Sequence, residues 1–144
     1  MKYLNKTFTP HLASAALQLT LVAAAFLAFF DPSILNPQNI GWSSEGDLRQ
    51  HYLGWTAFRH ADAVGTPWGN APLMAYPHGT PISATDSNPL VSLLLWPLSD
   101  LLPERFQFIG PWYLLSITLS FVIARSLFRR IGFDRFTAAL LGAF

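Results

Sequence analysis

The sequence predicts an all-α membrane protein in which two transmembrane helices flank a long outer loop. Half of the 144 residues are hydrophobic (51%) and only 12% are charged, against roughly 25% charged residues in a typical soluble domain. Two stretches, 12–30 and 106–124, contain no charged residue and have about the 20-residue length that crosses a bilayer. Basic and acidic side chains also concentrate in different segments. Together these observations predict an integral membrane protein and the order of its segments along the chain.

The N-terminal segment 1–11 is basic and is expected in the cytoplasm. Lys2 and Lys6 precede the apolar stretch 12–30, and no acid accompanies them. A cleaved signal peptide has the same order of features, and 23–25 could offer a small-residue cleavage site. The apolar run is longer than a signal core of about 7–15 residues, and it ends in bulky side chains. An uncleaved transmembrane helix is therefore the preferred interpretation.

Charge placement predicts the topology, because short cytoplasmic loops collect Lys and Arg. Six of the nine basic residues fall on the side assigned to the cytoplasm: Lys2, Lys6, Arg125, Arg129, Arg130 and Arg135. Seven of the eight acids fall in the outer segment: Asp31, Glu45, Asp47, Asp62, Asp86, Asp100 and Glu104. The predicted order is a cytoplasmic N-terminus, a span over 12–30, an outer loop over 31–105, a span over 106–124 and a cytoplasmic turn over 125–135.

Residues 136–144 read as the start of a truncated third span. We therefore expect an N-terminal fragment of a longer multi-pass membrane protein. Its expected partners are the lipid bilayer and the remaining spans of the full-length protein. The basic residues form no stripe with interleaved aromatic residues, so nucleic acid is not expected as a partner.

The outer loop is expected to carry two interfacial helices. Residues 44–63 place apolar side chains near helical spacing, so this helix would lie along the membrane surface with its apolar side down. Residues 90–102 are apolar but too short to span, which indicates an interfacial or re-entrant helix. Frequent Pro and Gly predict a turn-rich loop over 65–89. The tryptophans fit an aromatic belt at the interface: Trp42, Trp55, Trp68, Trp96 and Trp112.

Several classes of site are excluded. The chain has no cysteine, so it can form neither a disulfide nor a thiolate metal site. It contains no Walker loop, no dinucleotide-binding glycine motif, no GxSxG elbow and no HExxH motif.

Asp47 and His51 are four residues apart and would share one face of the helix predicted over 44–63. With Gln50 beside them, they could hold a divalent cation such as Mg²⁺ or Mn²⁺, or position an acceptor hydroxyl. The alternative is local: Ser44 and Asp47 match a capping box, and an acid in the first turn is favoured by the helix dipole. Both interpretations stay open at this point.

Asp86 is the second candidate acid. It could face Asp47 across a cleft, where two carboxylates bind a metal or supply a base, or it could form an Asx turn or cap a helix. Tyr76 and His78 lie in a tight turn and could contact a phosphate or a sugar hydroxyl, or simply be solvated. Arg59 could grip a lipid phosphate through a bidentate contact, or anchor its helix among headgroups.

The order of these features resembles the start of a glycosyltransferase of the GT-C superfamily. Five segments carry a narrower resemblance to an uncharacterised bacterial family of multi-pass inner-membrane proteins related to that superfamily: GDLRQHYLGWTAFR at 46–59, PWG at 67–69, YPHGTPI at 76–82, TDSNPL at 85–90 and FQFIGPW at 106–112.

The resemblance implies sugar transfer from a polyprenyl-phosphate donor to a periplasmic acceptor, with Asp47 in the position of the first-loop acid. Asp47 would take the acceptor proton or orient the hydroxyl, while Arg59, His78 or a divalent cation would stabilise the departing phosphate. As a fragment, the chain is expected to be inactive alone. The rival class is a non-enzymatic membrane protein, either a transporter or an envelope-assembly subunit.

Overall fold

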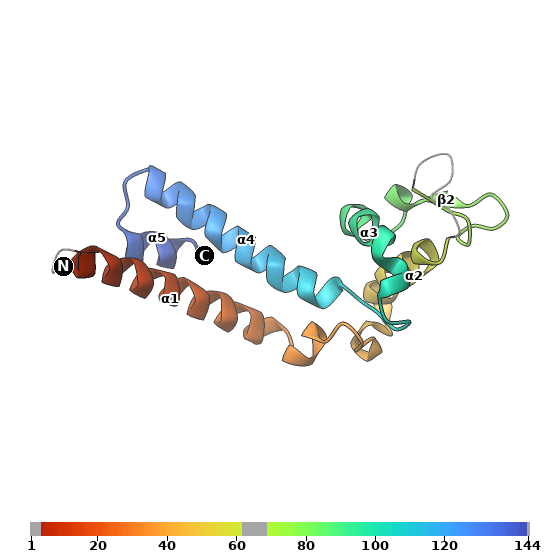
Figure 1. Ribbon diagram of the computed structural model, residues 1–144, viewed down its shortest axis with the longest axis horizontal. Coiled ribbons are helices and arrows are strands. Elements are labelled where there is room, and N and C mark those ends of the chain that lie inside the picture. The colour runs from red at the N-terminus through yellow and green to blue at the C-terminus, as the bar shows by residue number, and fades with distance from the viewer. Residues whose placement is uncertain (1–3, 62–68, 144) are drawn as a thin grey trace. The chain divides into compact units, whose positions relative to one another are not determined.

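The chain folds into two compact units. A computed structural model describes residues 4–61 and 69–143 (Figure 1). The first unit joins the two ends of the chain, Met1–Leu35 and Gly110–Phe144, and the second comprises Asn36–Ile109. Most of the 31–105 segment, expected from the sequence as a loop between spans, therefore forms a compact unit of its own.

Helix α1, Leu4–Phe29, begins the first unit. Ala and Leu dominate its sequence, and both are strong helix formers. Residues His11–Phe29 are long and apolar enough to cross a membrane, which confirms the apolar helix predicted over 12–30. The helix ends before Asp31, because proline disfavours helix in the residue that precedes it. The 3₁₀ helix η1, Pro32–Leu35, follows.

Helix α4, Ile109–Arg130, is the second helix long and apolar enough to cross a membrane. It begins three residues later than the predicted 106, because Gln107 belongs to the second unit. The Gln107 N–H donates to the Pro37 carbonyl at 2.7 Å, and its buried amide donates to the Asn36 carbonyl at 3.0 Å. At the other end, α4 continues through the arginines, since cations are favoured in the last turns of a helix.

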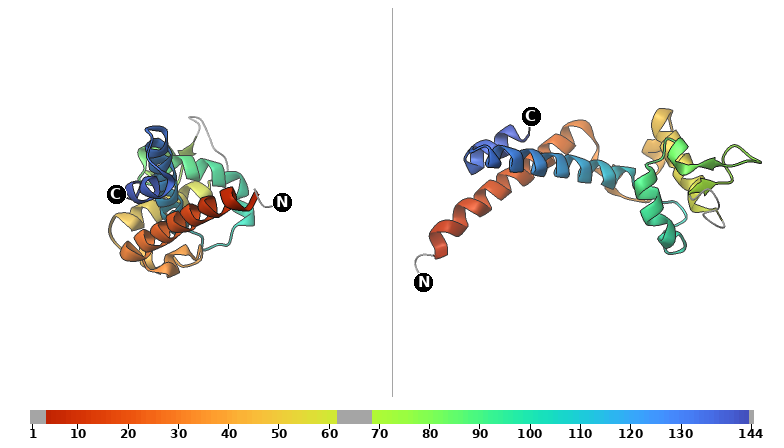
Figure 2. Two further views of the ribbon diagram at one scale, coloured as in Figure 1. Left: turned by 90° about the vertical axis from the view of Figure 1, so that its left-hand side faces the viewer. Right: turned by 90° about the horizontal axis from the view of Figure 1, so that it is seen from above.

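Helices α1 and α4 run in opposite directions (Figures 1 and 2). At one end the Phe30 ring lies 5.1 Å from the Tyr113 ring, centroid to centroid. At the other end Arg125 of α4 bonds to Ser14 and Gln18 of α1. The two helices are therefore joined by aromatic packing at one end and by polar contacts at the other.

Helix α5, Arg135–Leu141, packs along α1 within the same unit. Its first turn is capped by the Asp134 carboxylate, which accepts from the N–H groups of Phe136 and Thr137. A Cβ at Gly142 would lie only 2.9 Å from the backbone nitrogen of Arg125. A glycine is therefore needed where the end of α5 meets α4. Helix α5 begins where the third span was predicted; the span itself stays a prediction.

The second unit is built from short elements around one long helix. Its helices are η2 (Gly41–Ser43), α2 (Gly46–Arg59), η3 (Ile82–Ala84), α3 (Pro89–Leu95) and η4 (Trp96–Leu101). Strands β1 (Asn70–Ala71) and β2 (Thr80–Pro81) pair antiparallel, with Asn70 opposite Pro81. The described part of the turn-rich stretch predicted over 65–89 thus folds into a small hairpin followed by a 3₁₀ turn. Residues 62–68, which include Asp62 and Trp68, lie outside the described residues.

The core of the second unit forms on α2. Trp55 and Phe58 are 1% and 0% exposed. The Trp55 ring packs edge-on against Phe108 at 5.5 Å between centroids, and its indole N–H donates to the Phe106 carbonyl at 3.2 Å. The apolar side of α2 therefore faces the interior of this unit. This corrects two expectations, that the helix lies apolar side down on the membrane and that Trp55 belongs to an interfacial belt.

The ends of α2 also differ from the predicted 44–63. The Ser44 hydroxyl donates to the Gly41 carbonyl at 2.7 Å, and the N-cap residue is Glu45, so the predicted capping box does not form. Asp47 does lie in the first helical turn, as predicted. Gly46 has a φ of +59°, a left-handed conformation that glycine adopts without strain.

The apolar helix predicted over 90–102 is confirmed to within one residue. Helices α3 and η4 together span Pro89–Leu101, too short to cross a bilayer. The change from α to 3₁₀ geometry occurs at Trp96, just before Pro97, because proline cannot donate the next helical hydrogen bond. The N-cap is Asn88, whose side chain accepts from the Val91 N–H at 3.3 Å.

Candidate functional site

The start of α2 presents Asp47, Gln50 and His51 on its surface. Asp47 and Gln50 are exposed and His51 is half-buried. Within residues 4–61 and 69–143 no group pairs with the Asp47 carboxylate. An unpaired carboxylate in the first turn of a helix is held near the positive end of the dipole. Its acceptor positions are therefore not used by any residue that the structure describes.

His51 connects α2 to the segment that carries Asp86. Its Nδ1 contacts the carbonyl oxygen of Asp86. Because a carbonyl oxygen can only accept a hydrogen bond, Nδ1 carries the proton in this contact. A neutral imidazole then leaves Nε2 as an acceptor. The contact therefore orients His51 with its basic nitrogen available.

The segment around Asp86 is held firmly against α2. Ser87 is 2% exposed, and a Cβ at Gly54 would lie 3.0 Å from the Ser87 Cβ, so glycine allows the close approach. The hydroxyls of Thr85 and Ser87 hydrogen-bond at 2.7 Å. Since Asn88 caps α3, Asp86 does not cap this helix, which was one of the interpretations of this residue. Its side chain is exposed and unpaired within the part of the chain that the structure describes.

Arg59 occupies a structural position at the end of α2, which corrects the expectation that it contacts a lipid phosphate. Its terminal nitrogens donate four hydrogen bonds, at 2.6–3.3 Å, to the carbonyls of Ser99, Leu102, Pro103 and Glu104. The residue is 7% exposed, and its Nε is buried without a partner. No accessible N–H group is left for a bidentate phosphate contact.

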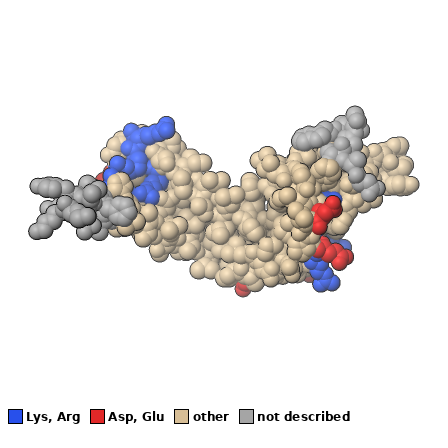
Figure 3. Space-filling view, in the orientation of Figure 1, with Lys and Arg blue, Asp and Glu red and all other residues tan. Residues whose placement is uncertain are grey.

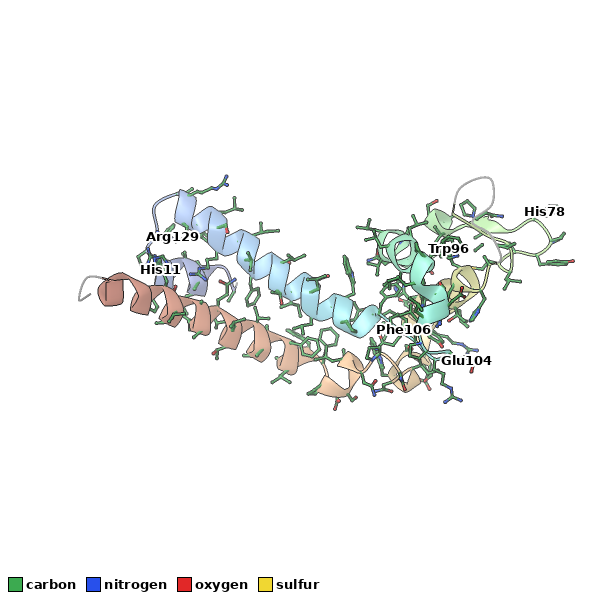
Figure 4. All side chains as sticks on the ribbon, viewed as in Figure 1. His11, His78, Trp96, Glu104, Phe106 and Arg129 are labelled. Carbon is green, nitrogen blue, oxygen red and sulfur yellow. The ribbon has the colours of Figure 1, made fainter. Side chains whose placement is uncertain are left out.

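Tyr76 and His78 lie on the connection between β1 and β2. Both side chains are exposed, Tyr76 by 85%. Figure 4 shows His78 at the tip of this connection. Among the described residues, no hydrogen bond or ring contact links either side chain to Asp47 or Asp86. The structure thus brings His51 and Asp86 together and leaves Tyr76 and His78 apart from them.

The metal prediction rests on two acids. Within the described residues no group of three or more His, Asp or Glu side chains could enclose a metal ion. Asp47 and Asp86, if they share a divalent cation, would need water or substrate oxygens to complete its shell. The shared Mg²⁺ or Mn²⁺ therefore stays a prediction.

The acids whose pKa values are lowered lie outside this site. Hydrogen bonds from the hydroxyl and N–H of Ser33 lower the pKa of Asp31, and the Thr137 hydroxyl does the same for Asp134. Each carboxylate is thus occupied by its own neighbours. This contrasts with the carboxylates of Asp47 and Asp86, which have no partner among the described residues.

The second unit also holds a cavity that sequence reasoning missed. It has a volume of about 640 Å³ and is lined by Arg59, His60, Ala61, Trp96, Pro97, Ser99 and Asp100. The Ser99 hydroxyl is buried there without a partner. The only feature of the sequence that could have indicated this cavity was Asp100, a single acid inside an otherwise apolar helix.

Fold and site together define a helical protein with two apolar helices and, between them in the sequence, a compact helical unit. The chain belongs to the family described as a domain of unknown function, DUF6311, whose model matches residues 19–144. That match includes the whole Asn36–Ile109 unit, so the candidate site lies inside the family domain. No curated protein and no solved structure matches the chain.

Proposed function

We propose that the chain is the N-terminal part of an integral protein of the bacterial inner membrane, with α1 and α4 crossing the bilayer. Both helices expose large apolar side chains, whose exposure to water is unfavourable and whose exposure to lipid is not. Leu19 is 67% exposed, Leu27 58% and Ile123 57%. Four arginines follow at or beyond the last turns of α4, which favours the cytoplasm for that end and the periplasm for Asn36–Ile109.

The burial pattern of α3 and η4 supports contact of this unit with the membrane. Leu90, Leu94 and Leu101 are 62%, 67% and 81% exposed, whereas Ser92 is 0% exposed. A helix in water has the opposite pattern, with leucines inside and serines outside. An interfacial position would place these leucines among lipid chains.

The proposed activity is transfer of a sugar from a polyprenyl-phosphate donor to an acceptor hydroxyl. The observation that carries it is the His51–Asp86 contact, which fixes the Asp86 segment on α2 one helical turn from the unpaired Asp47. A carboxylate without a partner among the described residues and an oriented imidazole one helical turn away are suited to general base catalysis.

In this proposal Asp47 accepts the proton of the acceptor hydroxyl, with His51 Nε2 as a second acceptor nearby. The hydroxyl oxygen forms a bond to the anomeric carbon as the bond from that carbon to the phosphate oxygen breaks. The lipid phosphate leaves with the electron pair. Because Arg59 is fully used by backbone carbonyls and His78 lies apart from His51 and Asp86, stabilisation of the phosphate falls to a divalent cation.

The test is an assay of the full-length protein in membranes with lipid-linked sugar donors. Asp47→Asn should lower transfer by roughly 10²–10⁴-fold, the contribution of a positioned base. Glu45→Gln is the matched control, because Glu45 is also exposed and lies two residues earlier. Equal membrane insertion and equal resistance to protease would show that both variants fold. Unchanged transfer by Asp47→Asn would overturn the role of Asp47. Absence of transfer by the wild-type protein would overturn the activity and favour a transporter or an envelope-assembly subunit.

A further inference from the structure

The end of the helix pair opposite to Phe30 encloses a polar cluster inside an apolar setting. Ser14 and Gln18 of α1 are 0% and 8% exposed. Both are hydrogen-bonded by Arg125 of α4: its guanidinium donates to the Ser14 hydroxyl at 2.8 Å and to the Gln18 side-chain oxygen. The cluster thus holds a cation between two helices that are otherwise apolar.

Arg125 retains both charge and hydrogen-bonding capacity. A guanidinium has five N–H donors, and these two bonds use two of them. Ser14 and Gln18 are neutral, so they do not balance the charge. Within residues 4–61 and 69–143 no carboxylate pairs with Arg125. Arg125 lies near the end of α4 that is assigned to the cytoplasmic side, where Arg side chains reach the lipid headgroups.

A groove between the same two helices leads away from this cation. It has a volume of about 210 Å³ and is lined by Ala15, Gln18, Leu19, Val22, Thr118 and Val122. Gln18 belongs to both the groove and the cluster. On α4, Thr118, Val122 and Arg125 follow helical spacing, which places them along one face. The Thr118 hydroxyl donates to the Leu114 carbonyl at 2.7 Å, so its donor is satisfied within α4.

The surroundings of Arg125 add positive charge. Arg129 and Arg130 are exposed at the end of α4, and blue atoms gather there in Figure 3. The nearest acid along the chain, Asp134, is occupied by Phe136 and Thr137. Figure 4 shows His11 and Arg129 at this same end of the unit. An anion approaching this end of the helices therefore meets a net positive field.

We propose that this site binds an anionic phospholipid, with the phosphate on the spare N–H groups of Arg125 and one acyl chain in the α1–α4 groove. A guanidinium matches a phosphate bidentately, and an alkyl chain matches an apolar groove. Free phosphate would leave the groove unused. The inference rests on the membrane part of the proposed function and is independent of sugar transfer.

The test is lipid retention by the full chain purified in detergent, measured by native mass spectrometry with phosphatidylglycerol and phosphatidylcholine as probes. The wild-type chain should retain phosphatidylglycerol preferentially. Arg125→Gln should lower that retention about 30-fold or more, because a bidentate charged contact is lost. Arg129→Gln is the matched control and should lower it by no more than about fivefold, the effect of one surface charge.

Val122→Trp gives a second, independent variant. Val122 is 44% exposed and lines the groove, so the indole would fill the groove without touching the core. It should reduce retention of phosphatidylglycerol although Arg125 is intact. Equal losses in Arg125→Gln and Arg129→Gln, equal retention of both lipids by the wild type, or full retention by Val122→Trp would each overturn the proposal.

Alkaline extraction of membranes tests the lipid site separately from the transmembrane assignment of α1 and α4 on which it rests. If the wild-type chain stays in the membrane and retains no phosphatidylglycerol, the lipid site alone is overturned. If the chain is released into the supernatant, the transmembrane assignment of α1 and α4 fails, and the lipid site is overturned with it.

Discussion

Each of the two compact units holds an arginine between its elements, and the partners of the two arginines differ. In the second unit, Arg59 of α2 donates to four backbone carbonyls at the end of η4 and just beyond it. In the first unit, Arg125 of α4 donates to two side chains of α1. Arg59 has no accessible donor left, whereas Arg125 has three N–H groups beyond these two bonds.

The difference teaches how each unit is held together. Carbonyls at the end of a helix have no partner within the helix, and Arg59 supplies one for several of them at once. The second unit thus depends on side chains bonded to irregular backbone. The first unit consists of long helices whose backbones satisfy themselves, so α1 and α4 are joined by a few side-chain contacts. Substitutions should therefore damage the two units by different mechanisms.

The largest effect is expected from Arg59→Ala. It would leave several carbonyls near η4 without a partner and should destabilise the second unit by roughly 3–5 kcal/mol, the range for breaking a buried charged cluster. Hydrogen exchange of the α2 and η4 peptides in the full chain measures the opening free energy, with α4 peptides as internal reference. Arg105→Ala is the control, because Arg105 is exposed and surface changes stay within about 0.5 kcal/mol.

Exchange in Arg59→Ala that matches the control would contradict this role. The guanidinium would then be available for a ligand, as the sequence alone had suggested. Arg59→Lys sharpens the result: it keeps the charge but cannot span four carbonyls with a planar fork. We therefore expect it to behave like the alanine variant.

A smaller effect is expected in the first unit from Gly110→Ala. A Cβ at Gly110 would lie 1.9 Å from the Ile34 carbonyl oxygen, so η1 or the start of α4 must shift. Overpacking of this kind costs about 1–3 kcal/mol. Thermal unfolding of the detergent-solubilised chain, followed by circular dichroism, would measure the loss. Ser120→Ala is the control on the same helix, since Ser120 is exposed and bonds only to the Ser116 carbonyl; equal melting of the two variants would refute the close packing at Gly110.

The same contrast explains what the sequence could predict. The apolar helices over 12–30, 106–124 and 90–102 were found because composition and length mark them locally. The burial of Trp55 and the hydrogen bonds of Arg59 were not predicted, because their partners lie 40 or more residues away in the sequence. Asp47 was correctly placed in the first turn of α2, which depends only on neighbours. The contact of His51 with Asp86 needed the folded unit, since nothing in either segment specifies the other.

The smallest effect concerns Asp134, whose carboxylate is bonded by local groups only. The Thr137 hydroxyl, followed by the N–H groups of Thr137 and Phe136, lowers the pKa of Asp134. Because the folded pKa lies below the unfolded one, the capping contribution is complete above the ordinary pKa of aspartate and is lost as the pH falls through the lowered value. An NMR titration of the Asp134 carboxyl should therefore show a midpoint below that of the same residue in the urea-unfolded chain. Thr137→Val should raise the midpoint toward the unfolded value, whereas a midpoint unchanged by Thr137→Val would mean that the hydroxyl is not the main cause.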